Sequence, residues 1–555
     1  VNQNRGSGCG VENYGIEYVR SSQILYEHCI RRHRMSTAYL VLLILAIIYV
    51  PIWIWAWRCP ESASRWHLQK YGPCIMIRTH LGIKAMDRLS GHRRFWSAFG
   101  FMSKVVSAIL FLMMMYMLIV AVIALPTTLT SGSSIGIEYA LAIPGFNPIM
   151  PLSYGIVALL IAMVVHEMAH GIQSRANGID VESSGLLYGV VPLGAFVEPN
   201  EEQLSKAPRK AQTDVYAAGI TINTVVAVVS ILLMASACGL VTSEYGDNAG
   251  AFYIDDRSPA YEAGIPASAL ILGIAEYNDG IEGGYVDVTA ETRGNAAYLN
   301  YEFDPLKQYS IRYIYHDEVK ETGPIHMGAY IKALTKGGPA DSAGIGAGSF
   351  IVSINETLIG NPIAFNDFMS GTSPGDVVEM KVCDADGSSI RSYTVQLGSK
   401  GSIGFRGIVS PTGGIQFTTP DLMLDYAVNP FCNAEGAYGH VKSFFSYLSG
   451  PFNGMDPIPN EIQWWYDAPG GNVFWVTITM LYWLFWLDIL LAISNALPTR
   501  ILDGGYIFSG GLSWLLERTG MRDAERREKI VENISGSVST ITLFLFMIVI
   551  MAMVV

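Results

Sequence analysis

The sequence predicts a polytopic α-helical membrane protein of about six spans, with an inserted β-rich region on the extracytoplasmic side. Of its 555 residues, 50% are hydrophobic and 15% are charged, whereas soluble domains carry about 25% charged residues. Several apolar runs are long enough to cross a bilayer. Acidic residues gather in 241–470, which holds 28 Asp and Glu against 12 Lys and Arg, a net charge of −16; the remainder therefore carries −12 − (−16) = +4.

Two leading spans occupy 37–125, after a polar N-terminal segment at 1–36. The first apolar run is 38–57, and its three tryptophans are typical of a membrane interface. The second run is 99–125. Between the two runs lie eight Lys and Arg against two acidic residues. Such an excess of positive charge indicates a cytoplasmic loop, which sets the direction of every later span.

The third and fourth spans belong to 151–240, the first part of the predicted membrane core. The third, 151–172, runs from outside to inside, and the fourth, 215–240, returns outward. Between them, Gly185–Asn200 is apolar but too short and too rich in Gly and Pro to span. We expect a re-entrant hairpin that lines a protein cavity; the alternative is an ordinary interfacial loop.

The acidic region contains an internal repeat. Ser258-Pro-Ala-Tyr-Glu-Ala-Gly-Ile265 is echoed by Gly338-Pro-Ala-Asp-Ser-Ala-Gly-Ile345. Short runs of strand-forming residues with Gly turns surround both copies, which favours two β-rich domains. The copy at 324–398 resembles a PDZ domain, and the copy at 249–322 resembles a degenerate one. We expect Gly328–Ile331 to bind a peptide carboxylate; the alternative is a spacer without a ligand.

The rest of the chain returns to the membrane. Residues 400–470 are predicted to be a linker that is rich in Gly and Pro. The second part of the core, 471–510, contains the fifth span at 473–497 and a short helix that begins near Leu502. The segment 511–555 combines a charged cytoplasmic loop with the last span, 538–555.

The third span ends in the pattern His166-Glu167-Met-Ala-His170. Residues four apart share one face of a helix, so both imidazoles can bind one metal ion while the intervening glutamate lies beside it. The alternative is a solvated helix face. Ionisable groups in an apolar span cost about 2.5–3.5 kcal/mol each on insertion scales, and this cost favours a metal site.

A third ligand is expected from Asp503, because the third and fifth spans both end on the inner side. Pro498 breaks the fifth span, and Asp503 is followed by two glycines. A set of two histidines and one carboxylate leaves a fourth position open, as in catalytic zinc sites. The alternative for Asp503 is a simple turn. Asn495 could assist the site or cap the broken helix, and we favour a structural role for Asp488.

These residues resemble the site-2 protease family of intramembrane zinc metalloproteases, in its archaeal form with a PDZ insertion. The resemblance rests on the zinc-binding pattern at His166–His170, on Asn495-Ala-Leu-Pro498 and on Leu502-Asp503-Gly504. Gly185–Pro199 is similar to that family's hairpin. Ala218–Asn223 is similar to its Ala-Gly-x-x-x-Asn motif, with Ile220 where the family has proline.

The resemblance implies Zn²⁺ bound by His166, His170 and Asp503, with Glu167 as general base and acid. It implies Asn223 as the oxyanion donor; the alternative for Asn223 is a hydrogen bond between helices. It also implies that an edge strand of the hairpin holds an unwound substrate. Expected partners are transmembrane substrates, the lipid bilayer and a peptide or C-terminus at the PDZ region.

Two further function classes compete with a protease. The first is a non-catalytic PDZ-bearing receptor or chaperone, which the intact metal pattern argues against. The second is a transporter, which predicts inverted repeats of broken helices that the sequence does not show. Nothing indicates nucleic-acid binding. We expect a multi-pass protein of the cell membrane, with the PDZ region outside and the active site near the cytoplasmic side.

Overall fold

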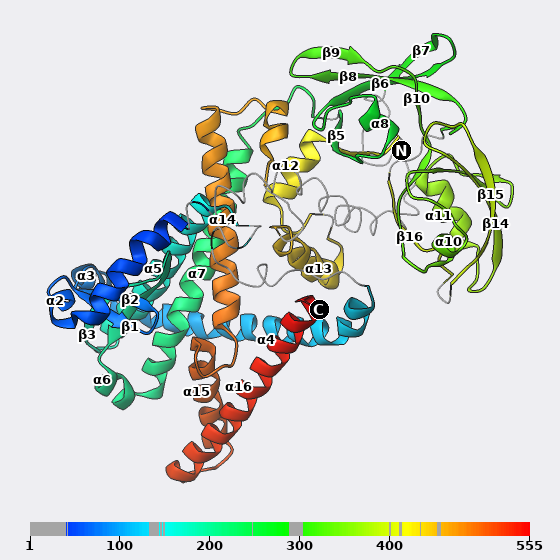
Figure 1. Ribbon diagram of the computed structural model, residues 1–555. Helices are drawn as coiled ribbons and strands as arrows, with labels where there is room; N and C mark the ends of the chain where they lie inside the picture. The colour runs from blue at the N-terminus through cyan, green and yellow to red at the C-terminus, as the bar shows by residue number, and fades with distance from the viewer. Residues whose placement is uncertain are drawn as a thin grey trace, which may run out of the picture. The chain divides into compact units, whose positions relative to one another are not determined.

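The structure, a computed structural model, consists of two compact units (Figure 1). The β-rich unit contains Ala235–Val476, and the helical unit joins Arg31–Met234 to Thr477–Val555. Each unit is described by itself. The residues described are 40, 43–131, 144, 147, 150–246, 248–287, 303–398, 401–409, 413–432, 434–451 and 457–554.

Five helices among the described residues are long and apolar enough to cross a membrane. They confirm the second to the sixth predicted spans as helices. The first predicted span, 38–57, corresponds to the shorter apolar helix Leu43–Arg58, and its beginning lies outside the described residues. The count of six therefore stays a prediction. The five are α4 (Arg93–Ser131), α5 (Leu152–Ala176), α7 (Arg209–Cys238), α14 (Asn472–Asn495) and α16 (Ala524–Val554).

A small antiparallel sheet packs beside α5, in the order β1-β2-β3-β4. Its second half is the hairpin that the sequence predicts, whereas β1 and β2 come from the predicted cytoplasmic loop 58–98 and were not expected. Buried Met86, Ile172 and Val181 join the sheet to the helices. The elements are α2 (Pro60–Ser64), β1 (Leu68–Tyr71), β2 (Cys74–Thr79), α3 (Ile83–Ser90), β3 (Val181–Tyr188), β4 (Pro192–Pro199) and α6 (Glu201–Lys206).

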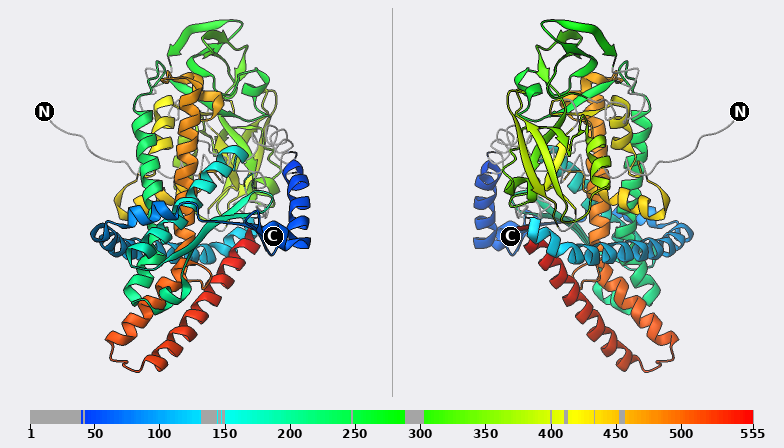
Figure 2. Two further views of the ribbon diagram at one scale, coloured as in Figure 1. Left: turned by 90° about the vertical axis from the view of Figure 1, so that its left-hand side faces the viewer. Right: turned by 90° about the vertical axis from the view of Figure 1, so that its right-hand side faces the viewer.

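The chain turns sharply between α14 and α15 (Asp503–Arg518). Proline at 498 cannot continue the helix, and Asp503 opens the next one. Both following glycines are required by close approach: a Cβ at Gly504 would lie 2.4 Å from the Ala496 carbonyl oxygen, and one at Gly505 would lie 2.1 Å from that of Thr499. Helices α15 and α16 then form the hairpin seen in Figures 1 and 2.

The two repeat copies form two separate sheets with the same local pattern of strand, four-residue helix and strand. The first sheet has the order β10-β8-β6-β5-β17, with β7 on β6 and β9 on β8. Its strands and helix are β5 (Ala249–Ile254), α8 (Pro259–Glu262), β6 (Leu270–Tyr277), β7 (Ile281–Asp287), β8 (Gln308–Tyr315), β9 (Glu318–Glu321), β10 (Ile325–His326) and β17 (Ile415–Thr418).

The second sheet has the order β15-β14-β12-β11-β16, with β13 on β12. Phe365 from α11 joins its buried core, so this helix covers one face of the sheet (Figure 1). The elements are β11 (Ala329–Leu334), α10 (Pro339–Ser342), β12 (Phe350–Ile354), β13 (Thr357–Leu358), α11 (Pro362–Ser370), β14 (Val377–Cys383), β15 (Ile390–Gln396) and β16 (Phe405–Val409).

The segment 400–470, treated as a linker in the sequence analysis, contributes to both sheets. Strand β16 completes the second sheet, and β17 then returns to pair with β5 of the first. The second domain is therefore inserted into the first. The order of the two repeat copies in the sequence does not reveal this insertion. The remaining elements of this segment are α12 (Pro420–Val428), α13 (Gly436–Leu448) and the 3-10 helix η3 (Asn460–Trp465).

Candidate metal centre and active-site cavity

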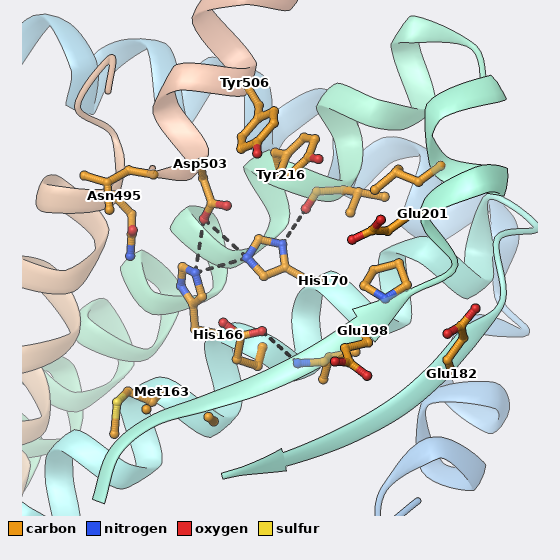
Figure 3. A pocket seen from close by; sticks show the side chains of 18 of the residues that line it. Met163, His166, His170, Glu182, Glu198, Glu201, Tyr216, Asn495, Asp503 and Tyr506 are labelled. Carbon is orange, nitrogen blue, oxygen red and sulfur yellow. Dashed lines mark hydrogen bonds and ion pairs between the residues drawn. The ribbon is translucent and has the colours of Figure 1, made fainter. Parts of the chain in front are cut away.

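The two histidines of α5 meet Asp503 at the start of α15. His166 Nε2 lies 3.1 Å from His170 Nε2 and 3.1 Å from Asp503 Oδ2. The third distance, between His170 Nε2 and Asp503 Oδ2, is 3.3 Å. Two histidines of one helix and an aspartate that lies 337 residues after His166 thus present their donor atoms to one point (Figure 3).

Glycine in α7 allows the two imidazoles to lie against a helix backbone. A Cβ at Gly219 would lie 2.5 Å from His170 Nε2 and 2.7 Å from His166 Nε2. Any side chain at this position would therefore fill the space between the imidazoles. The glycine of the Ala218-Gly219 motif is explained by this contact.

A backbone carbonyl orients one of the imidazoles. His170 Nδ1 donates to the Val215 carbonyl oxygen at 2.7 Å. This bond leaves the lone pair of Nε2 directed toward Asp503, as in metal-binding histidines. His166 Nδ1 is buried and has no hydrogen-bond partner in the part of the chain that the structure describes.

Opposing effects act on the Asp503 carboxyl. Burial alone would raise its pKa, but the charges and hydrogen bonds of His170 and His166 together hold the pKa below its ordinary value. The carboxylate form is therefore favoured at this position. An ionised oxygen can accept from both imidazoles or bind a metal ion.

The donor set fits zinc. With zinc–nitrogen and zinc–oxygen distances of about 2.0–2.1 Å, ligand atoms around a tetrahedral ion lie about 3.3 Å apart, and the three atoms here lie 3.1–3.3 Å apart. At this separation the two ring nitrogens and the carboxylate oxygen need either shared protons or a metal ion between them. Nitrogen and carboxylate ligands suit zinc.

Glu167 lies beside this set and contacts the hairpin. Its ligand atom falls within 4.8 Å of those of His166 and His170. Its Oε2 accepts a hydrogen bond from the backbone N–H of Val197 in β4, at 3.0 Å. The glutamate is therefore held between the metal-ligating groups and the edge strand of the small sheet.

These groups open into a cavity of about 870 Å³. Asn495, Tyr216 and Tyr506 also line it, and Figure 3 shows the two tyrosines next to Asp503. The rings of Tyr216 and Tyr506 are stacked, with centroids 4.1 Å apart. Residues 194, 195 and 197–199 of β4 form another part of the lining. The cavity thus combines acid–base groups, an amide, an aromatic pair and a strand edge.

The structure does not bring Asn223 or Asp488 to this cavity, although both are fully buried. Neither side chain has a hydrogen-bond partner among the described residues. The helix–helix hydrogen bond considered for Asn223 is therefore not formed with any described residue. Asn495, for which the sequence left two roles open, lines the cavity.

Several residues at the site carry no signal in the sequence. Val215 and Val197 act through their backbone atoms, which no side-chain pattern reveals. Tyr216 lies just before the Ala218-Gly219 motif, and Tyr506 lies one turn after Asp503. Their closeness to these motifs is the one feature of the sequence that could have indicated them.

The predicted carboxylate-binding segment of the second β-domain runs into an interior strand. Strand β11 pairs with β12 on one side and with β16 on the other. A peptide cannot add to a strand that is paired on both sides. Among the described residues, the free edge next to β11 belongs to β16, where Gly401 and Gly404 adopt positive φ values of 69° and 89° just before the strand. Phe405 at its start packs against Phe365 of α11, at 5.7 Å between ring centroids.

Comparison with known proteins agrees with this site. A relative from Methanocaldococcus jannaschii, itself uncharacterised, is 35% identical over 205 residues. The match covers 36% of this chain and 53% of the relative, so the chain matches about half of that protein's length. The family model for peptidase family M50 matches residues 154–546, which include His166, His170 and Asp503. The chain therefore belongs to peptidase family M50, the site-2 protease family of zinc metalloproteases.

Proposed function

We propose that this chain is an intramembrane zinc metalloprotease that hydrolyses peptide bonds within or near the spans of other membrane proteins. The observation that carries the proposal is the convergence of His166, His170 and Asp503 on one point, with Glu167 beside them in one cavity. Helix α5, which brings the histidines there, is apolar enough to cross a bilayer.

His166, His170 and Asp503 would hold the metal and leave a position for water. Zinc, when bound, supplies a Lewis acid and lowers the pKa of water toward about 7. Glu167 takes the proton of the attacking water as the new carbon–oxygen bond forms. It then delivers this proton to the leaving nitrogen as the carbon–nitrogen bond breaks, so the protons balance.

An amide donor would stabilise the oxyanion that develops on the scissile carbonyl oxygen. The family resemblance implies Asn223 for this role. The place of Asn495 on the cavity lining, and the absence of Asn223 from it, support Asn495 instead. An amide provides a hydrogen-bond donor without adding a charge to the cavity.

The substrate would be held extended along β4. A membrane span arrives as a helix, whose backbone groups are already paired and protect the scissile bond. In the small sheet, β4 pairs with β3 alone among the described residues, and it lines the cavity. Hydrogen bonds to this edge can replace those of the helix while the substrate unwinds.

The β-rich unit would select substrates from the extracytoplasmic side, with the metal centre near the cytoplasmic side of the cell membrane. The free edge of β16 beside α11 supports peptide or C-terminus binding at that position. Binding there would favour proteins whose outer domains have already been cut. The β-rich unit could also exclude proteins whose outer domains are intact and therefore too large to enter. This exclusion would likewise favour proteins that have already been cut.

The test is cleavage of a labelled single-span protein by the purified chain in proteoliposomes. Wild type should cleave, a zinc chelator should stop cleavage, and added Zn²⁺ should restore it. Glu167→Gln should keep zinc yet cleave at least about 100-fold more slowly, because the proton acceptor is lost. Cleavage by Glu167→Gln at the wild-type rate would refute the mechanism.

A further inference from the structure

The free edge of β4 contains one hydrogen bond that the mechanism above does not use. The backbone N–H of Val197 donates to Glu167 Oε2 at 3.0 Å. This N–H therefore points away from β3 and toward α5. The general base is bound directly to the strand along which the substrate is expected to lie.

The register of β4 shows which other groups face the same side. Residues 194–198 pair with β3 without a break, from Gly194 opposite Leu187 to Glu198 opposite Ser183. Backbone N–H groups alternate in direction along such a strand. The N–H of Ala195 therefore faces the same side as that of Val197. Pro199, the next residue of this set, has no N–H.

An added strand thus finds a donor at Ala195 but not at the two following positions of this edge. The Val197 N–H is taken by Glu167, and Pro199 offers none. Donation of backbone N–H groups from β4 to an added strand therefore ends beside Glu167. The peptide bond that follows the paired part of the substrate lies opposite Val197, next to the group that moves the proton.

We propose that the N–H of Val197 positions Glu167, and that the substrate pairs with Ala195, so that the bond opposite Val197 is the one cleaved. The inference rests on the proposed function and deepens it by fixing the substrate register. One oxygen of the carboxylate is held by β4, which leaves the other for the water. Strand and base are thereby fixed relative to each other.

Close packing between α5 and β4 maintains this arrangement. A Cβ at Gly171, one turn after Glu167, would lie 3.0 Å from Val197 Cγ1 and 2.5 Å from Met86 Sδ. The absence of a side chain at Gly171 thus allows the helix and strand to approach. Alanine at this position would press on the side chains of Met86 and Val197 and so disturb the packing of β4 against Glu167.

Two proline variants on the same edge test the proposal. Neither Val197→Pro nor Ala195→Pro removes a bond to β3, because both N–H groups face away from it. The full-length enzyme in proteoliposomes would be assayed with a synthetic single-span alanine–leucine peptide that has a central Asn-Gly pair and a fluorescent label. Val197→Pro should lower kcat about 10- to 100-fold with little change in KM, because a misplaced catalytic group slows the chemical step. Ala195→Pro should raise KM with little change in kcat.

Zinc content and the circular dichroism spectrum should match wild type in both variants, which separates positioning from misfolding. Gly171→Ala should reproduce the fall in kcat, and it replaces Val197→Pro if that variant does not fold. A rise in KM in both proline variants would overturn the inference, because Val197 would then be a substrate donor. Wild-type values of kcat and KM in both proline variants would also overturn the inference. If wild type itself does not cleave, the proposed function fails and the inference fails with it.

Discussion

Two sets of polar groups are buried in the helical unit, and they differ in what surrounds them. His166, His170 and Asp503 lie within 3.1–3.3 Å of one another at an open cavity. Asn223 and Asp488 are more deeply buried but have no hydrogen-bond partner among the described residues and do not line the cavity. A polar side chain inside an apolar helix therefore does not by itself indicate a functional site. The convergence of several such side chains at a cavity does indicate one.

The two sets also differ in the free energy that it costs to bury them. A buried polar group without a partner costs about 1–3 kcal/mol, and an unpaired charge costs more. In the convergent set, a metal ion can offset that cost. In the isolated set, nothing among the described residues does so. Substitutions should therefore impair chemistry in the first set and affect stability alone in the second.

The largest expected contrast is between the two aspartates. Asp503→Asn should reduce bound zinc well below one per chain and lower cleavage by more than about 100-fold, because a charged ligand is lost. Asp488→Asn should keep both zinc and cleavage with little change in the midpoint of thermal unfolding, because the amide is as buried and as unpaired as the carboxyl that it replaces. Metal analysis and a thermal scan measure these effects. Zinc loss in Asp488→Asn would break the comparison.

The two asparagines give the next contrast. Asn495→Ala should lower kcat about 100-fold at unchanged zinc content, because an oxyanion donor acts mainly in the transition state. Asn223→Ala should leave kcat near the wild-type value. Steady-state kinetics on one peptide substrate compares them directly. The reverse order would return the oxyanion role to Asn223.

Lys332 extends the comparison to the β-rich unit, with the smallest expected effect. Its ammonium is buried without a hydrogen-bond partner among the described residues, and it lies 4.3 Å from the ring centroid of Tyr253. Burial lowers its pKa to about 8, with Arg257 adding to the fall and Asp255 opposing it. Between pH 8 and its ordinary pKa of 10.5 the unfolded state binds the extra proton, so stability should rise with pH across this window.

Lys332→Met keeps the apolar stem and removes the charge. The variant should be more stable than wild type below pH 8, and this advantage should shrink as the pH approaches 10.5. Chemical unfolding of both full-length proteins at a series of pH values measures the difference. Parallel pH profiles would show that Lys332 does not titrate in this window.

Patterns of side chains were sufficient to predict much of this architecture. Apolar runs predicted six spans, and five of them are long apolar helices among the described residues. The spacing of His166 and His170 placed both on one face of α5. Asp503 was expected at the site because the third and fifth spans were both predicted to end on the inner side of the membrane. Apolar runs, charge bias and residue spacing can all be taken from a single sequence.

The remainder depends on pairing between distant segments. Strands β1 and β2 join the hairpin across about a hundred residues, and β17 returns to β5 after the whole second domain. Val197 and Val215 act through backbone groups that every residue except proline shares. Asn223 and Asn495 are the same residue type in similar helices, so only the position of the cavity distinguishes them.

The central claim is that Glu167 directs water to a peptide bond within a membrane span. The most direct measurement is mass spectrometry of the products formed in ¹⁸O-labelled water from a single-span substrate in proteoliposomes. We predict one ¹⁸O atom in the new carboxyl group, at a position inside the span, in wild type and not in Glu167→Gln. A cut confined to the extramembrane part of the substrate, or the same labelled product from Glu167→Gln, would contradict the account.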